Sequence, residues 1–271
     1  MARISGAIPR IEAQAAHIAF VNAVAPPYVM LPIDHAKRLC DDDETAASIF
    51  PEQTRVITTT TIADDLLDRL SWDKECEIIK RFAPAFHIPA DHAVYGDDPS
   101  AKQADRAHRC ATGTLWMADQ FAEAGISTEI IPLIKGSTKS ERRFGYRVCE
   151  TLETNLAAVY VAQYFSGKGG HPAVFRLLEA IETETDATLD ILVIGLLSTY
   201  YLPDAPENVV AAAGLNAWLD VVRPRSSDSS TMRERYQSLS ADVNMALGLT
   251  DRATKSASEP NLANERTAKE D

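Results

Sequence analysis

The chain lacks the sequence features that define several common classes of protein. Its 271 residues include only four cysteines, at positions 40, 76, 110 and 149, and no two of them form a C-x-x-C pair. A zinc knuckle or a thioredoxin-like redox motif is therefore not supported, and we expect buried free thiols. No apolar run reaches the roughly 18 to 20 residues that a membrane-spanning helix needs. Because Glu12 and Gln14 interrupt the apolar start, we expect a cytoplasmic protein with no signal peptide and no membrane partner.

Lysine is also scarce. The sequence contains nine lysines against eighteen arginines, and its 39 acidic residues give a net charge of −12. An acidic balance argues against a nucleic-acid partner, because binding to phosphates depends on basic side chains. Acid-rich, lysine-poor surfaces also suit proteins that stay soluble in very high salt. At molar salt the Debye length falls to about 3 Å, so net charge would then exclude few partners. We therefore hypothesise a halophilic protein.

A dinucleotide-binding motif is missing as well, since no G-x-G-x-x-G follows the first predicted strand. The chain instead alternates strand-like and helix-like segments. Apolar runs predict strands at residues 16–24, 55–61, 85–90, 128–134, 157–164, 190–197 and 209–214. Helical periodicity predicts helices at residues 101–124, 140–155, 171–185 and 229–248.

These elements predict an α/β protein with parallel strands. Several of the strands are continuously apolar, which is typical of parallel strands that helices cover. Seven or eight strands in about 230 residues favour a (β/α)8 TIM-barrel-like single domain over residues 1–250, with a doubly wound open sheet as the alternative. Residues 251–271 are polar and lack apolar periodicity, so we predict a disordered tail.

In parallel α/β folds, ligands bind where the carboxyl ends of the strands meet the following loops. Asp91 is the first candidate, because it follows the run Phe86–Ala90 directly, although it could simply shape a turn. Asp228 is the second, and a helix N-cap is its simpler interpretation. The segments 135–138 and 166–170 could each hold an anion, but neither has the spacing of a phosphate-binding loop.

Several strand-end fragments together resemble the tRNA-guanine transglycosylase superfamily, and most closely its branch that inserts 7-deazaguanines into DNA. They are FHIPADH, EIIPLIKGS, AVYVAQYFS, DILVIGLLS and SSDSSTMRERY, all within residues 80–236. The resemblance implies a (β/α)8 barrel that replaces guanine in a nucleic acid, DNA rather than tRNA, with a free 7-deazaguanine. The exchange would pass through a covalent aspartyl-glycosyl intermediate. The cysteine-rich zinc site of the tRNA enzymes is absent, and we expect neither a metal nor a cofactor.

The resemblance also implies roles for individual residues. Asp228 would be the nucleophile and Asp91 would meet the Watson–Crick edge of the base. Asp64, in ITTTTIADD, would have to replace an acid from the family's Asp-Ser-Gly-Gly segment, which this chain lacks. The base pocket would comprise Gln163, Tyr164, Lys135, Gly136, Gly195, Leu196 and Ser198, and the nucleic-acid contacts Arg223, Arg225, Arg233 and Arg235. Two alternatives remain open: an unrelated barrel enzyme acting on a small phosphorylated metabolite, and a non-catalytic barrel that binds nucleic acid or a partner.

Overall fold

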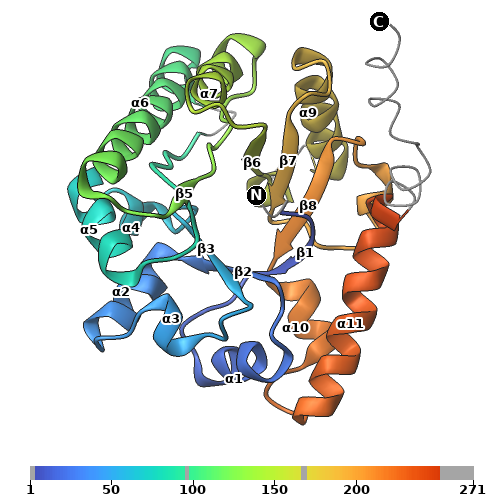
Figure 1. Cartoon of the computed structure of the whole chain (residues 1–271). Coiled ribbons are helices and arrows are strands. Elements are labelled where there is room, and N and C mark those ends of the chain that lie inside the picture. The colour runs from blue at the N-terminus through green and yellow to red at the C-terminus, as the bar shows by residue number, and fades with distance from the viewer. Residues whose placement is uncertain (1–3, 95–97, 166–169, 251–271) are drawn as a thin grey trace, which may run out of the picture.

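The computed structural model describes residues 4–94, 98–165 and 170–250, which form a mixed α/β fold (Figure 1). All eight strands in these ranges pair in parallel, in two four-stranded sheets of order β1-β8-β7-β6 and β2-β3-β4-β5. The strands are β1 (Gly6–Pro9), β2 (Tyr28–Pro32), β3 (Arg55–Thr59), β4 (Phe86–Ile88), β5 (Glu129–Ile130), β6 (Leu156–Tyr160), β7 (Asp190–Ile194) and β8 (Val209–Gly214).

Helices surround the strands. Figure 1 shows the strands in the middle of the molecule and the helices on the outside, with α1, α2, α5, α6, α7 and α9 following one another around the sheets in chain order. The longer helices are α1 (Ala15–Val24), α2 (Ile33–Asp41), α5 (Trp72–Phe82), α6 (Ser100–Ala124), α7 (Lys139–Thr151), α9 (Gly170–Glu184), α10 (Asn216–Val222) and α11 (Ser229–Ala246). The short ones are α3 (Ala46–Ile49), α4 (Asp64–Leu67), α8 (Ala162–Phe165) and the 3-10 helix Leu202–Asp204. Within the described ranges, no helix combines the length and the apolar character needed to cross a membrane.

The two sheets meet at both of their edges. An isolated parallel bridge between Arg10 and Met30 connects the chain after β1 to β2, and a second bridge between Leu133 and Ala158 connects the chain after β5 to β6. Each edge strand of one sheet therefore lies beside an edge strand of the other.

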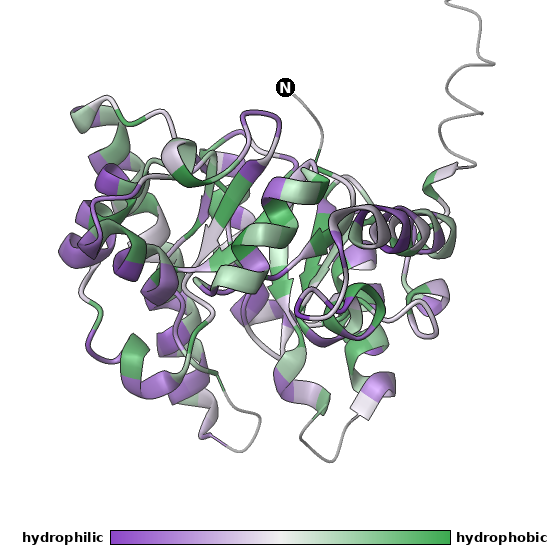
Figure 2. Cartoon of the chain, turned by 90° about the horizontal axis from the view of Figure 1, so that it is seen from below, coloured by the Kyte–Doolittle hydropathy of each residue, from purple (hydrophilic) through white to green (hydrophobic). Residues whose placement is uncertain are grey.

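Alternate residues of the strands divide the hydrophobic core in two. One cluster faces the helices and includes Val29 and Val193. The other is formed by residues of both sheets that pack against one another, including Ile8, Met30 and Leu192. Because successive side chains of a strand point to opposite faces, this second cluster lies on the side of the sheets away from the helices. Figure 2 shows hydrophobic strands at the centre and more hydrophilic turns of helix at the periphery.

The prediction of a strand at residues 16–24 is wrong, because Ala15–Val24 is helix α1. The segment is rich in alanine, the best helix former, and its buried residues His17, Phe20 and Val21 recur at helical spacing. A short apolar run cannot be told from a buried helix by periodicity alone. Strands β1 and β2, on either side of this helix, were not predicted.

The other predicted elements are confirmed, with shifted ends. The predicted strand 128–134 is paired only at Glu129–Ile130 and at the Leu133 bridge, and the predicted strand 157–164 ends at Tyr160, where α8 soon follows. Helix α6 ends at Gly125, whose φ of 63° is left-handed, as a C-cap requires. The predicted tail, 251–271, lies outside the described residues.

Candidate functional site

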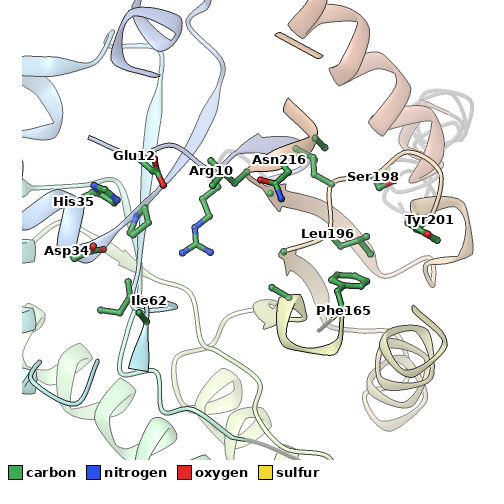
Figure 3. A pocket seen from close by; sticks show the side chains of 18 of the residues that line it. Arg10, Glu12, Asp34, His35, Ile62, Phe165, Leu196, Ser198, Tyr201 and Asn216 are labelled. Atoms are coloured by element: carbon green, nitrogen blue, oxygen red, sulfur yellow. The ribbon is translucent and has the colours of Figure 1, made fainter. Parts of the chain in front are cut away.

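The carboxyl ends of six strands open into one cavity of about 500 Å3 (Figure 3). Its walls come from the segments that follow β1, β2, β3, β6, β7 and β8, so residues far apart in the sequence meet there. The polar lining residues are Arg10, Glu12, Asp34, His35, His171, Ser198, Tyr201 and Asn216, and the apolar ones include Ile62, Leu66, Phe165, Leu196 and Leu197. A volume of this size and a mostly apolar lining with a few polar groups are typical of small-molecule sites.

Arg10 is the central cation of this cavity. Ile8 of β1 faces the inner cluster, and because side chains alternate along a strand, Arg10 lies on the same face one step nearer the carboxyl end. Its backbone is held by bonds from Arg10 N–H to the Gly214 carbonyl (2.9 Å) and from the Trp218 indole to the Arg10 carbonyl (2.8 Å). Figure 3 shows the guanidinium pointing into the middle of the cavity.

The guanidinium of Arg10 is only partly satisfied by the protein. Its Nη2 donates to the Thr61 carbonyl at 2.6 Å, and the side chain also bonds to Tyr160. In the part of the chain that the structure describes, it forms no ion pair with a carboxylate. Burial lowers the pKa of Arg10, but an arginine remains charged at neutral pH because its ordinary value is so high. The cavity therefore presents a cation to whatever enters it.

Acidic groups stand beside this cation. Asp34, in the first turn of α2, and Glu12, in the loop after β1, both line the cavity and both act electrostatically on Arg10. The Asp34 Oδ1 atom is buried, and no described residue forms a hydrogen bond with it. Such atoms are rare in proteins and mark places where a ligand or water completes the bonding. Glu12 is held by its own N–H, which donates to His17 Nδ1 at 3.0 Å.

Aromatic rings form the opposite wall. His171 stacks on Tyr201 with ring centroids 3.5 Å apart, and Phe165 lies 4.8 Å from His171. Tyr200 packs edge-on against Tyr201 and is 80% exposed, which is unusual for a ring of its size. In Figure 3, Phe165 and Tyr201 lie across the cavity from Asp34. A planar ligand entering the cavity would thus meet ring faces on one side and charged groups on the other.

Gly195 allows the loops of this wall to pack closely. Its φ is +97°, and a Cβ at that position would lie 2.6 Å from the Ala162 Cβ and 2.8 Å from its backbone nitrogen. Real Cβ atoms do not approach so closely, so only glycine fits. The close approach is to the neighbouring strand-end segment rather than to a ligand.

A second polar cluster lies inside the strand ends but does not line the cavity. Lys135 and Asp91 form an ion pair at 2.5 Å, and both side chains are less than a tenth exposed. Burial opposes the charge on Lys135, but Asp91 outweighs it, so the pKa of Lys135 is raised. Tyr160 acts on Lys135 as well as on Arg10, and it therefore connects the two clusters electrostatically.

The turn that presents Asp91 is fixed from below by a buried network. Glu75 of α5 accepts bonds from the Ala90 N–H and from His87 Nε2, both at 2.9 Å, and His87 Nδ1 meets Thr58 Oγ1 at the same distance. Ala90 itself has a left-handed φ of 54°. Asp91 is thus a rigidly positioned partner of Lys135 and not a free carboxylate, which differs from the expectation that it meets a ligand.

The expected nucleophile Asp228 lies at the start of helix α11. It is fully exposed and caps helix α11, where its Oδ1 accepts from the Thr231 N–H (2.8 Å) and the Ser230 hydroxyl (2.7 Å). These bonds lower the pKa of Asp228 to about 2. Neither Asp228 nor Asp64, in helix α4, lines the strand-end cavity, so the three expected acids do not meet there.

The predicted pocket residues divide into three groups. Gly195, Leu196 and Ser198 do line the cavity. Gln163 and Tyr164 lie on α8 between the lining residues Ala162 and Phe165, whereas Lys135 and Gly136 belong to the second cluster and the start of the α7 region. Residues 166–169 of the glycine-rich segment lie outside the described ranges.

The predicted arginines mostly bond to the protein itself. Arg233 donates to the Ala23 carbonyl (2.6 Å), Arg225 to the Gln14 side chain (2.9 Å) and Arg235 to the Ser227 hydroxyl (3.0 Å). Arg223 donates to the Asp220 carbonyl three residues earlier in the chain. They therefore join α10, α11 and the loop between them to neighbouring segments.

Sequence reasoning missed Arg10, Glu12, Asp34 and His35. A signal for two of them was present. The segment Leu31–His35 reads LPIDH, and the segment Ile88–His92 reads IPADH, so the pattern that drew attention to Asp91 also occurs after β2. No family model and no curated protein matches the chain.

Proposed function

We propose that the chain is a (β/α)8 barrel enzyme whose strand-end cavity binds a guanine-like base and exchanges it at a nucleoside of a nucleic acid. The barrel is supported by the two bridges that join the sheets at both edges and by the hydrophobic cluster that residues of both sheets share. Cavities at the carboxyl ends of the strands hold the active sites of such barrels.

The ligand class rests on one observation: the cavity places a partly buried cation and a carboxylate in the same lining. Arg10 offers N–H donors, and the Asp34 carboxylate offers acceptor oxygens. The complementary ligand carries a carbonyl oxygen and N–H groups on one edge. Guanine and 7-deazaguanine have this edge, with O6 as the acceptor beside N–H donors. Adenine has an amino group in place of the carbonyl oxygen and no ring N–H beside it, so it would offer Asp34 one donor group instead of two and Arg10 only a ring nitrogen.

The aromatic wall suits the same ligand. A base is flat, and stacking on an aromatic side chain contributes about 1–3 kcal/mol per base. The stacked pair His171 and Tyr201 offers such a face at the mouth of the cavity.

Base exchange requires a carboxylate at the sugar. In a retaining glycosyl transfer one carboxylate attacks C1′ and a second group handles the proton of the leaving base. Since Asp228 caps a helix outside the cavity, Glu12 takes the role of nucleophile in this proposal and Asp34 that of proton carrier. The C1′–N bond breaks as the Glu12–C1′ bond forms, and the incoming base reverses both steps.

The two alternatives have less support. A site for a phosphorylated metabolite would need its anion loops at the cavity, but residues 135–138 are absent from the lining, and residues 166–169 lie outside the described residues. A non-catalytic barrel that binds nucleic acid or a partner would be expected to have its strand-end cavity filled by side chains, whereas this one holds a cavity of about 500 Å3.

Ligand binding can be tested by calorimetry with guanine, 7-deazaguanine and adenine. We expect the two guanine-like bases to bind and adenine not to bind. Asp34→Asn should weaken guanine binding by tenfold or more, because an amide cannot match both N–H donors. Ser198→Ala, elsewhere in the lining, serves as the comparison. Equal binding of adenine and guanine would contradict the proposed ligand class.

Exchange itself can be tested with labelled guanine on DNA and on tRNA. Glu12→Gln should abolish incorporation while guanine binding persists, and Asp228→Asn should retain it. Loss of incorporation in Asp228→Asn alone would restore Asp228 as the nucleophile. Nucleoside mass spectrometry of DNA and tRNA from cells with and without the gene identifies the polymer, and unchanged nucleosides in both would refute base exchange.

A further inference from the structure

The basic residues of this acidic chain are unevenly distributed. Residues 99–147, which span α6, β5 and most of α7, contain eight lysines and arginines against five acidic residues. The whole chain has a net charge of −12, so the remaining segments are strongly acidic. Positive charge is therefore concentrated in the part of the chain that forms α6 and α7.

Three of these cations form a stripe on α7. Lys139, Arg143 and Arg147 are spaced by four residues, so they lie on one face of the helix, and all three are exposed. Together they line an open groove of about 860 Å3. No described carboxylate forms an ion pair with any of the three. We call these residues the α7 basic stripe.

Two acidic residues, Glu150 and Glu184, line the same groove, and Glu184 already bonds to other side chains. Glu184 in the groove forms a two-pronged ion pair with Arg142 at 2.5 and 2.9 Å and accepts a bond from the Tyr146 hydroxyl at 2.7 Å. Its pKa is lowered: burial opposes its charge, but the bonds from Arg142 and Tyr146 outweigh that effect. The other acid of the groove, Glu150, lies one turn beyond the stripe. Lys139 acts electrostatically on Glu184, but among the described residues none of the three stripe cations forms an ion pair with a carboxylate.

The dimensions of the stripe match a phosphate backbone. Three residues spaced by four along a helix span about 12 Å, since each residue rises about 1.5 Å. One strand of duplex DNA carries a phosphate about every 3.4 Å along its axis, so the stripe would face about three or four phosphates. Lysine and arginine donors are the groups that bind such phosphates, and the flexible stems let each reach its own.

We propose that the α7 basic stripe is the surface that holds the sugar–phosphate backbone of a nucleic acid. The choice of a nucleic acid as the partner rests on the proposed function. The proposed surface differs from the one expected from the sequence, which comprised Arg223, Arg225, Arg233 and Arg235. Those four side chains donate hydrogen bonds within the protein. The described residues form no such bonds with the side chains of the α7 basic stripe. Helix α7 begins directly after the strand-end segment that carries Lys135, so Lys139, the first residue of the stripe, lies near the carboxyl ends of the strands.

The test is fluorescence anisotropy with a labelled 20-base-pair DNA duplex and an RNA hairpin, without free base, over a series of salt concentrations. Arg143→Ala/Arg147→Ala should weaken binding at least tenfold at low salt and reduce the slope of log affinity against log salt by about 2. Arg38→Ala/Arg176→Ala removes the same charge from exposed positions on α2 and α9 and should change neither quantity.

Three outcomes would overturn the inference. Equal losses in both double variants would show that net charge alone matters. A loss only in Arg233→Ala/Arg235→Ala would move the surface to α11. If the wild-type chain bound neither nucleic acid, the proposed partner would be wrong. Calorimetry with guanine would still test the ligand of the cavity independently. Preference for the duplex or the hairpin separates DNA from RNA.

Discussion

At the scale of single residues, the ion pair between Lys135 and Asp91 is the most consequential contact in the strand interior. Removing a charge from water costs several kcal/mol, and a partner offsets that cost only while the pair stays intact. The pair is also rigidly placed, because Asp91 N–H donates to Thr60 Oγ1 and the preceding turn is held by Glu75. We expect it to fix the positions of the β4 and β5 ends rather than to take part in chemistry.

Lys135→Met should therefore lower the free energy of unfolding by about 3–5 kcal/mol, because it leaves Asp91 buried without a partner. The double variant Lys135→Met/Asp91→Leu should recover much of that loss. Urea denaturation of the three proteins measures both effects. A double variant less stable than the single one would show that the two groups contribute independently.

The same pair predicts a dependence on alkaline pH. The pKa of Lys135 is raised above its ordinary value of 10.5, so its contribution to stability is complete below that value and is lost as the pH rises through the folded value. Unfolding free energies measured from pH 8 to 11.5 should fall more steeply in the wild-type chain than in Lys135→Met/Asp91→Leu. Parallel curves would contradict a charged Lys135 in the folded state.

At the scale of elements, Asp228 illustrates how a helix end uses an acid. Helix α11 begins at Ser229, and the Asp228 carboxylate accepts from the N–H of Thr231, one of the donors that the first turn leaves unpaired. The same helix packs against α1, α10 and β1, so its start helps to align one side of the molecule.

Asp228→Ala should lower the melting temperature, whereas Asp228→Asn, which keeps an acceptor, should stay close to the wild type at neutral pH. Because the folded pKa of Asp228 is lowered to about 2, its extra contribution is present above its ordinary value of 3.8 and disappears as the pH falls toward 2. Thermal unfolding at pH 2 and pH 7 measures the difference. Asp242→Ala, an exposed acid inside the same helix, is the matched control, and an equal effect there would argue against the cap.

At the scale of the whole molecule, the charge balance remains the main clue to working conditions. Thirty-nine acidic side chains against 27 basic ones repel each other in dilute buffer. Salt screens this repulsion, since the Debye length shortens from about 10 Å at 0.1 M to about 3 Å at 1 M. The halophilic hypothesis depends on this self-repulsion of the folded state.

We expect the melting temperature to rise steadily between 0.1 and 3 M potassium chloride. Guanidinium chloride as the comparison salt separates screening from general salting-out, because it screens charge but does not strengthen apolar burial. A melting temperature that stays constant or falls in potassium chloride would reject the halophilic hypothesis.

The sequence by itself determined the type of fold and most of its later elements. From residue 55 onward, apolar runs and helical spacing identified the strands and the long helices, because both patterns are local and repeat along the chain. The N-cap at Asp228 and the C-cap at Gly125 could also be inferred, since each depends on a few consecutive residues. Gly195, Leu196 and Ser198, which follow the predicted strand 190–197 or end it, were also expected at the site, and they line the cavity.

Tertiary structure alone decided which polar residues share the site. Asp34 and Asp91 follow nearly the same sequence pattern, yet one lines the cavity and the other is neutralised by Lys135 from a neighbouring strand end. Arg10 follows a strand of four residues, too short for its apolar pattern to stand out. Its position depends on β8, which is about 200 residues away in the chain and pairs with β1. The physical reason is that the charge partners and the walls of a cavity come from different strands, and no local pattern encodes which strand ends meet.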